Sequence, residues 1–260
     1  ETCGKIGLVG AALSDYPEID DLCDAITGSL SVSSLRADSL SEKLVARLAA
    51  SGNKTIALAP EAGSERLRKV INKGVTEADI LGAADKVFKA DIPNLKLYFI
   101  IGLPTETQED VDAIVDLATK VHEVQLGHAR PRGRIGRITL SVNSFVPKPF
   151  TPFQWEPMEE VASLNRKLRF LEKAVKNIGN MNIIHDLPKW EYFQAMLSRG
   201  DRRLGKLLLA AHAKSGDWKA AARETDMDLD FYVTRKRAFD EVLPWDFIDI
   251  GVRKEYLRNE

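Results

Sequence analysis

The alternation of short apolar runs with amphipathic segments constrains the fold of this chain more than any other feature of its sequence. Five runs have the composition of strands: Ile6–Leu13, Ser29–Leu35, Thr55–Pro60, Leu95–Leu103 and Arg137–Phe145. Their first residues lie 23 to 42 positions apart, which leaves room for one helix between successive strands. This order predicts an α/β fold of parallel strands joined by right-handed helical crossovers.

Capping residues mark where three of the intervening helices begin. Ser39 and Glu42 have the spacing of a capping box, Thr76 can cap a second helix, and Thr107 with Asp110 can cap a third. Apolar residues at helical spacing follow each of them: Leu40, Leu44, Val45 and Leu48; Ile80, Leu81, Ala84, Val87 and Phe88; and Val111, Ile114, Val115, Ala118 and Val121.

The predicted strands are apolar on one face only. The apolar set is Ile56 and Leu58; Leu95, Leu97, Phe99 and Ile101; and Ile138, Leu140 and Val142. Strands covered by helices on both faces would be apolar on both. The pattern therefore predicts a partial (β/α) barrel, similar to part of a TIM barrel, whose polar lumen holds a ligand. The candidate substrate or lumen residues are Lys96, Tyr98, Ser141 and Asn143.

Polar residues gather where the predicted strands end, which is where barrel enzymes place their chemistry. This ring comprises Ser14, Asp15, Arg36, Asp38, Glu61, the segment Gly102–Glu106 and the segment Asn143–Lys148.

Helical patterns replace strands beyond Phe150. A helix is predicted over Pro157–Gly179, with a short edge strand at Met181–Ile184, and further helices include Leu204–Lys214 and Asp230–Glu241. We expect a barrel domain at residues 1–185 and a helical appendix at 186–260.

Charge and cysteine content exclude several classes of protein. Lys and Arg (37) nearly balance Asp and Glu (38), so no global field attracts nucleic acid or anionic lipid. No apolar run approaches the roughly 20 residues of a membrane helix. Cys3 and Cys23 are too few for a disulfide framework and lack metal-ligand spacing, which fits a reducing, cytoplasmic location and a structural role for the thiols.

Three segments carry a resemblance to a known family. The stretch Pro60–Gly74 (PEAGSERLRKVINKG) is followed by LKLYFIIGLPTETQED and then by SFVPKPFTPFQW. Together they resemble the radical S-adenosylmethionine (SAM) superfamily, in the subgroup with an upstream cobalamin-binding-like domain, related more distantly to the methylthiotransferases. The resemblance covers roughly residues 1–180 and implies strands two to six of a six-stranded partial barrel.

The resemblance implies an iron–sulfur enzyme. In the family, three cysteines in C-x-x-x-C-x-x-C hold a [4Fe–4S] cluster, SAM chelates the fourth iron, and its reductive cleavage gives a 5′-deoxyadenosyl radical that abstracts a substrate hydrogen. That motif is absent from the 260 residues, so we expect the first strand and its cysteine loop upstream of Glu1; the alternative is a homologue that has lost the cluster. A reductant such as flavodoxin or ferredoxin is implied as partner, cobalamin is a candidate cofactor of the full-length protein, and the substrate is unknown.

One family motif, G-x-I-x-G-x-x-x-E, places the adenine of SAM. Here it is carried by Ile100, Gly102 and Glu106, with Pro104 fixing the turn, whereas Tyr98 replaces the first glycine and narrows the lumen. The alternative is an ordinary strand-to-helix turn punctuated by Gly and Pro.

Other candidate SAM ligands follow from the same resemblance. Glu61, Ser64 and Arg66 correspond to the region that contacts the ribose hydroxyls and the methionine moiety. The alternative is a surface ion pair of Glu61 or Glu65 with Arg66 or Arg68. Arg36 is either a ligand or an ion-paired strand end, Lys148 is expected to be solvated, and no residue is assigned a catalytic role.

Two further functions stay open. The arginine-rich segment His128–Arg137 is interpreted as a mobile loop before the predicted strand Arg137–Phe145. Arg130, Arg132 and Arg134 also suit a non-catalytic barrel that binds RNA or a protein partner. A methylthiotransferase-like modification is the alternative within the family. The chain by itself is expected to be inactive, since it lacks the cluster motif.

Overall fold

The computed structural model describes residues 4–10 and 13–260, which form two compact units. The first comprises Glu1–Ile101, Thr105–Asn143 and Lys167–His185, and the second Gly102–Pro104, Ser144–Arg166 and Asp186–Glu260. The second unit therefore combines the expected appendix with two segments from the middle of the chain. The domain boundary after residue 185 stays a prediction.

Parallel strands form the centre of the first unit. They are β1 (Lys5–Leu8), β2 (Ser29–Val32), β3 (Thr55–Glu61), β4 (Asn94–Ile101), β5 (Ile138–Ser144) and β6 (Met181–His185). β1 pairs with β2, the other four form a sheet in the order β3-β4-β5-β6, and a parallel bridge from Leu35 to Leu58 joins β2's continuation to β3. Every predicted strand is present in the predicted order. The first ends at Leu8, and residues 11–12 of its predicted range lie outside the described residues.

The helices of this unit include α1 (Ile19–Ala25), α2 (Glu42–Ala50), α3 (Glu65–Val70), α4 (Glu77–Lys89) and α5 (Gln108–Arg132), with a 3-10 turn η1 (Leu13–Asp15). The predicted cap Thr76 is confirmed, since its hydroxyl accepts from Asp79 N at 3.2 Å. The cap predicted at Ser39 is wrong: Ser41 accepts from Leu44 N at 3.0 Å, while the Ser39 hydroxyl donates to Ser14 Oγ at 2.8 Å. A partner 25 positions away thus outcompetes the local cap.

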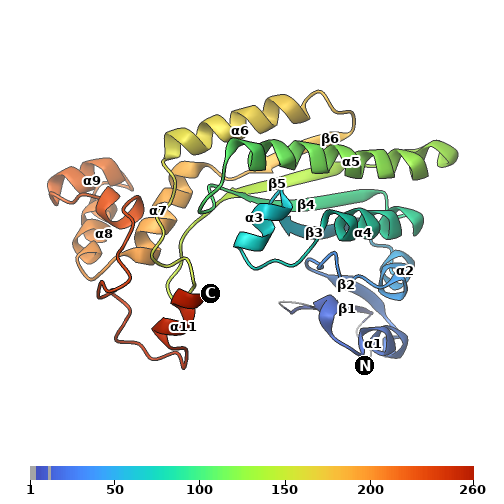
Figure 1. The fold of residues 1–260 in the computed structure, drawn as a ribbon, viewed down its shortest axis with the longest axis horizontal. Helices are drawn as coiled ribbons and strands as arrows, with labels where there is room; N and C mark the ends of the chain where they lie inside the picture. Colours follow the sequence, from blue (N-terminus) through green and yellow to red (C-terminus); the bar gives the residue numbers. More distant parts are fainter. Residues whose placement is uncertain (1–3, 11–12) are drawn as a thin grey trace. The chain divides into compact units, whose positions relative to one another are not determined.

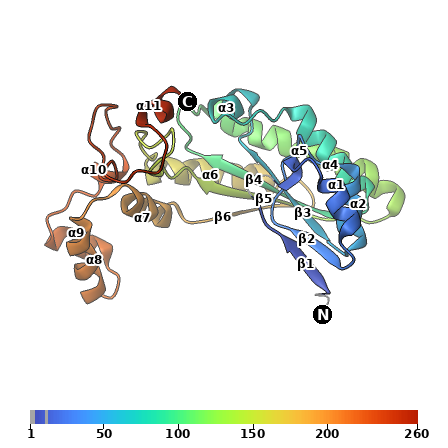
Figure 2. The same ribbon diagram turned by 90° about the horizontal axis from the view of Figure 1, so that it is seen from below.

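Helices cover one face of the first unit's strands (Figures 1 and 2). The strands alternate accordingly, with buried residues under α2, α4 and α5 and half-buried residues on the other face, as the burial of Ile56, Leu58, Leu95, Leu97, Phe99 and Ile101 shows. Among the described helices of this unit, none lies over that second face (Figure 2). The arrangement confirms an α/β partial barrel with one open face.

The second unit is mainly helical. It contains α7 (Pro188–Arg199), α8 (Leu204–Ala213), α9 (Trp218–Glu224), α10 (Asp230–Val233) and α11 (Lys254–Asn259), while α6 (Val161–Val175) begins in it and is shorter than the predicted 157–179. The helix predicted over Asp230–Glu241 ends at Val233. Beyond that point the Arg237 N–H donates to Trp155 O at 2.9 Å instead of to its own helix.

Candidate functional site

The open face of the sheet brings the predicted lumen residues together. Lys96, Tyr98 and Ile100 alternate with the buried residues of β4. On β5 Asn143 is exposed, whereas Ser141 is itself buried, at 7% exposure. Lys96 Nζ lies 4.7 Å from the centre of the Tyr98 ring. Among the described residues, the side chains of Tyr98 and Asn143 have no hydrogen-bond partner, so their polar atoms remain available to a ligand.

Glu61, at the carboxyl end of β3, has an unusual backbone. Its φ is +68°, in the left-handed region that non-glycine residues rarely occupy. The pairing of β3 with β4 shifts between Leu58 and Glu61, which is a bulge at the strand end. The Glu61 carboxylate accepts from Lys73 Nζ at 3.1 Å, so both ends of the PEAGSERLRKVINKG segment meet here.

Arg36 lies in an ionic cluster just after β2. Its guanidinium donates to Asp38 at 3.1 and 2.6 Å and lies 3.3 Å from Asp15. The hydrogen bonds from Arg36 hold the pKa of Asp38 below its usual value. These three predicted ring members are therefore brought together, and Arg36 is an ion-paired strand end whose role as a ligand stays a prediction.

Ser64 and Arg66 converge on Asp110, a residue that the sequence identified only as part of a helix cap. Ser64 Oγ donates to Asp110 Oδ1 at 2.5 Å, Arg66 Nε to the same oxygen at 3.2 Å, and Arg66 Nη2 to Oδ2. Arg66 Nη2 also donates to Thr105 O at 2.8 Å. For Arg66 the alternative of an ion pair with Glu61 or Glu65 is wrong, because Asp110 takes its guanidinium. For Arg68 the alternative is confirmed, since Arg68 Nη2 lies 4.0 Å from Glu65 Oε1, although the Arg68 side chain is buried.

Electrostatics make Asp110 the anchor of this junction. It is only 3% exposed. Burial alone would raise its pKa, but hydrogen bonds from Arg66, Ser64 and Thr107 outweigh that effect and hold the pKa well below the usual range. Since Thr107 N also donates to Asp110 at 2.7 Å, one carboxylate ties the beginning of α3 to the beginning of α5.

The turn after β4 combines a required glycine with a strained threonine. Gly102 has φ +76°, and a Cβ there would lie 2.9 Å from Leu164 Cδ2 and 3.1 Å from Glu159 Oε2. Pro104 follows in the same short segment, and Thr105 has φ +66°. The space beside Gly102 that a Cβ would fill is thus occupied by two side chains, and the adenine contact predicted for Ile100, Gly102 and Pro104 stays a prediction.

Glu106, the last residue of that motif, has a definite partner. Its side chain is 2% exposed and lies 2.6 Å from Lys167 Nζ. This buried pair joins the segment before α5 to α6, which is a positioning role that the family motif alone does not indicate. A ligand contact at Glu106 stays a prediction.

Two surface assignments from the sequence are corrected. The segment from His128 to Arg132 is the end of α5, not a mobile loop, because Arg132 donates to Phe88 O and Lys89 O and Arg134 pairs with Asp91. Lys148 is not fully solvated: its Nζ donates to Ser198 Oγ at 3.1 Å, and burial lowers its pKa.

The described residues do not fit an iron–sulfur cluster. Cys23 is buried and free, which agrees with a structural thiol, and burial raises its pKa, with Asp20 adding to the effect. Across residues 4–10 and 13–260, no three His, Cys, Asp or Glu side chains are placed to share a metal ion. In the same part of the chain no helix has the length and apolar character needed to cross a membrane.

Comparison with known proteins finds three kinds of similarity. Over 234 residues the chain is 36% identical to the uncharacterized protein MJ0966 of Methanocaldococcus jannaschii, covering 89% of this chain and 49% of that protein, so it spans about half the length of this relative. The chain also resembles three crystal structures of Streptococcus suis SuiB, of which one is bound to S-adenosylmethionine and one to the precursor peptide SuiA. They align over 69–70% of this chain and 38–39% of SuiB, at 15% identity and TM-scores of 0.46–0.49. Residues 2–118 match the model of the Radical SAM superfamily. This match agrees with the family that the sequence motifs indicate.

Proposed function

We propose that this chain forms the larger part of the catalytic barrel of a radical SAM enzyme. Its role is to bind SAM and a substrate at the open face and carboxyl ends of the strands, and to shield them from water. The ligands of the [4Fe–4S] cluster lie outside the described residues in this proposal, and a flavodoxin- or ferredoxin-like reductant supplies the electron. When bound, the cluster would supply the reducing chemistry that splits SAM. Substrate, cobalamin dependence and cytoplasmic location remain predictions.

The observation that carries the proposal is the irregular backbone at the end of β3 and in the turn that follows β4. Glu61 and Thr105 are both non-glycine residues with positive φ, and a bulge precedes Glu61. Such conformations cost about 1–3 kcal/mol each and cluster at sites of function. The family match includes both residues.

Each side chain has a role suited to its surroundings. Glu61, held by Lys73, presents a fixed carboxylate that can accept from ribose hydroxyls. Tyr98 and Asn143 offer unpaired donors and acceptors along the open face. Arg66 is a positioning residue in this account, since most of its donors are used by Asp110 and Thr105.

The variant Glu61→Gln tests the SAM assignment in the natural protein that contains this chain, reconstituted anaerobically. Losing the carboxylate is expected to raise the KM for SAM about tenfold in assays of 5′-deoxyadenosine release, because hydrogen bonds to a charged group contribute about 1.5–3 kcal/mol. Glu109→Gln, the same chemical change at an exposed position of α5, is the matched control. Equal KM values for the two variants would show that Glu61 does not contact SAM.

A further inference from the structure

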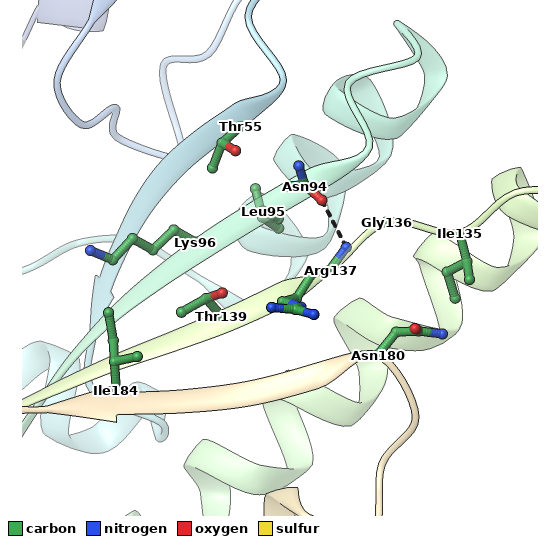
Figure 3. Close-up of a pocket in the computed structure, with 10 residues that line it drawn as sticks. All are labelled: Thr55, Asn94, Leu95, Lys96, Ile135, Gly136, Arg137, Thr139, Asn180 and Ile184. Atoms are coloured by element: carbon green, nitrogen blue, oxygen red, sulfur yellow. Dashed lines mark hydrogen bonds between the residues drawn. The ribbon is translucent and has the colours of Figure 1, made fainter.

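A second concave region lies at the amino ends of the same strands, opposite to the expected catalytic end (Figure 3). It has a volume of about 550 Å³, within the range of small-molecule sites. Six of the residues that surround it are Asn94, Lys96, Arg137, Thr139, Asn180 and Ile184. All its lining residues belong to the first compact unit.

The walls of this pocket are fixed by backbone hydrogen bonds. Asn94 Oδ1 accepts from Arg137 N at 2.9 Å (Figure 3), and Leu95 N donates to Arg137 O at 3.0 Å. Ile138 N donates to Asn180 O at 3.0 Å. Gly136 allows the two strand beginnings to approach, since a Cβ there would overlap Pro93 O. The pocket is therefore preformed.

Two cations line the pocket and no acidic side chain does. Among the described residues, neither Lys96 Nζ nor the Arg137 guanidinium has a carboxylate partner. Lys96 Nζ lies instead over the Tyr98 ring. The neighbouring Arg132 and Arg134 differ, because both lie against Asp91. The whole chain carries a net charge of −1, whereas the charged residues that line this pocket are both cations.

The remaining lining groups define what else a ligand would meet. Asn94, Asn180 and Thr139 add polar groups, while Leu95, Ile135 and Ile184 supply apolar surface. We propose that this pocket binds a small molecule that carries a phosphate or carboxylate on an apolar body, with Lys96 and Arg137 as the anion contacts. The proposal does not depend on SAM chemistry, and it gives Lys96 a ligand at the amino end of the lumen.

Titration calorimetry on the 260-residue chain tests the pocket with three probes that share one ring. Phenyl phosphate and benzoate carry the two oxyanions, and benzyl alcohol is the neutral control. We expect at least one anion to bind more tightly than benzyl alcohol, and Arg137→Gln and Lys96→Gln each to weaken that binding about tenfold. Arg130→Gln, which removes the same charge from an exposed site of α5, is expected to leave it unchanged.

The two anions also distinguish which anionic group the natural ligand carries. Tighter binding of phenyl phosphate indicates a phosphate ester, and tighter binding of benzoate indicates a carboxylic acid. Binding of benzyl alcohol as tightly as either anion would overturn the proposal. So would equal effects of Arg130→Gln and Arg137→Gln, or binding of single-stranded RNA with no binding of either anion. Circular dichroism of each variant checks that the sheet is intact.

Discussion

Replacing Gly63 by alanine is expected to lower the free energy of unfolding by about 3 kcal/mol, the upper range for overpacking a well-packed site. An added Cβ would lie 2.5 Å from Ala113 C and 2.8 Å from Asp110 O, and it would also overlap Ile114 N. All three atoms belong to the backbone of α5, which cannot move aside as a flexible side chain can. Gly63 is therefore the point where the turn after β3 packs directly on α5.

Urea unfolding of Gly63→Ala against Gly82→Ala measures this effect. Gly82 is exposed in α4 and a Cβ there would meet nothing within 4 Å, so alanine is expected to stabilise the chain by about 0.5–1 kcal/mol. Similar free energies of unfolding for the two variants would contradict the close packing of Gly63 on α5.

Asp110→Asn is expected to destabilise the chain by about 2–3 kcal/mol at neutral pH, because a buried charged acceptor is lost and its donors lose their partner. The effect should depend on pH. The pKa of Asp110 lies below the ordinary value of 3.8 in the folded state, so the unfolded chain takes up the proton first as the pH falls. The stability that Asp110 contributes is thus complete above about pH 5 and is lost progressively below it.

Unfolding free energies from pH 7 down to pH 3 distinguish this account from a loss of helix propensity. The difference between wild type and Asp110→Asn should shrink as the pH falls. Asp116→Asn, at an exposed position of the same helix, should show a difference near zero throughout. A gap between wild type and Asp110→Asn that stays constant from pH 7 to pH 3 would rule out a charged, low-pKa Asp110.

Much of the barrel could be predicted from local patterns. The strand alternation predicted which residues of β3 and β4 are buried, and Thr76 was recognisable as a cap because its partner Asp79 lies three residues away. Ser39 was misassigned because its hydroxyl binds Ser14, far away in the sequence. The helix beginning at Asp230 ends at Val233, earlier than predicted. The residues after Val233 have helical propensity, but there the backbone bonds to another segment, as Arg237 N does to Trp155 O.

Among the site residues, too, local patterns predict some features and distant partners determine others. The positions of Glu61 and Gly102 at strand ends follow from strand boundaries, and the face that Tyr98 occupies follows from the alternation along β4. The partner of Arg66 does not, because Asp110 lies 44 positions away and looks like an ordinary cap residue. Likewise the capture of Arg134 by Asp91 depends on how α5 packs beside α4, and no pattern within the arginine-rich segment reveals it.

The pocket at the amino ends had no sequence signal either. Most of its residues lie at or just before the beginnings of β3, β4, β5 and β6, while Ile184 lies near the end of β6. Only the sheet order places Lys96 and Arg137 around one cavity. The expected SAM site and this pocket therefore occupy opposite ends of the same strands.

We propose that this chain works as part of a SAM-cleaving iron–sulfur enzyme. The most direct measurement is electron paramagnetic resonance of the natural protein containing this chain, reconstituted anaerobically with iron and sulfide, reduced, and recorded with and without SAM. We expect a reduced [4Fe–4S] signal that changes when SAM is added. A protein that takes up no cluster, or whose cluster signal is identical with and without SAM, would contradict the account.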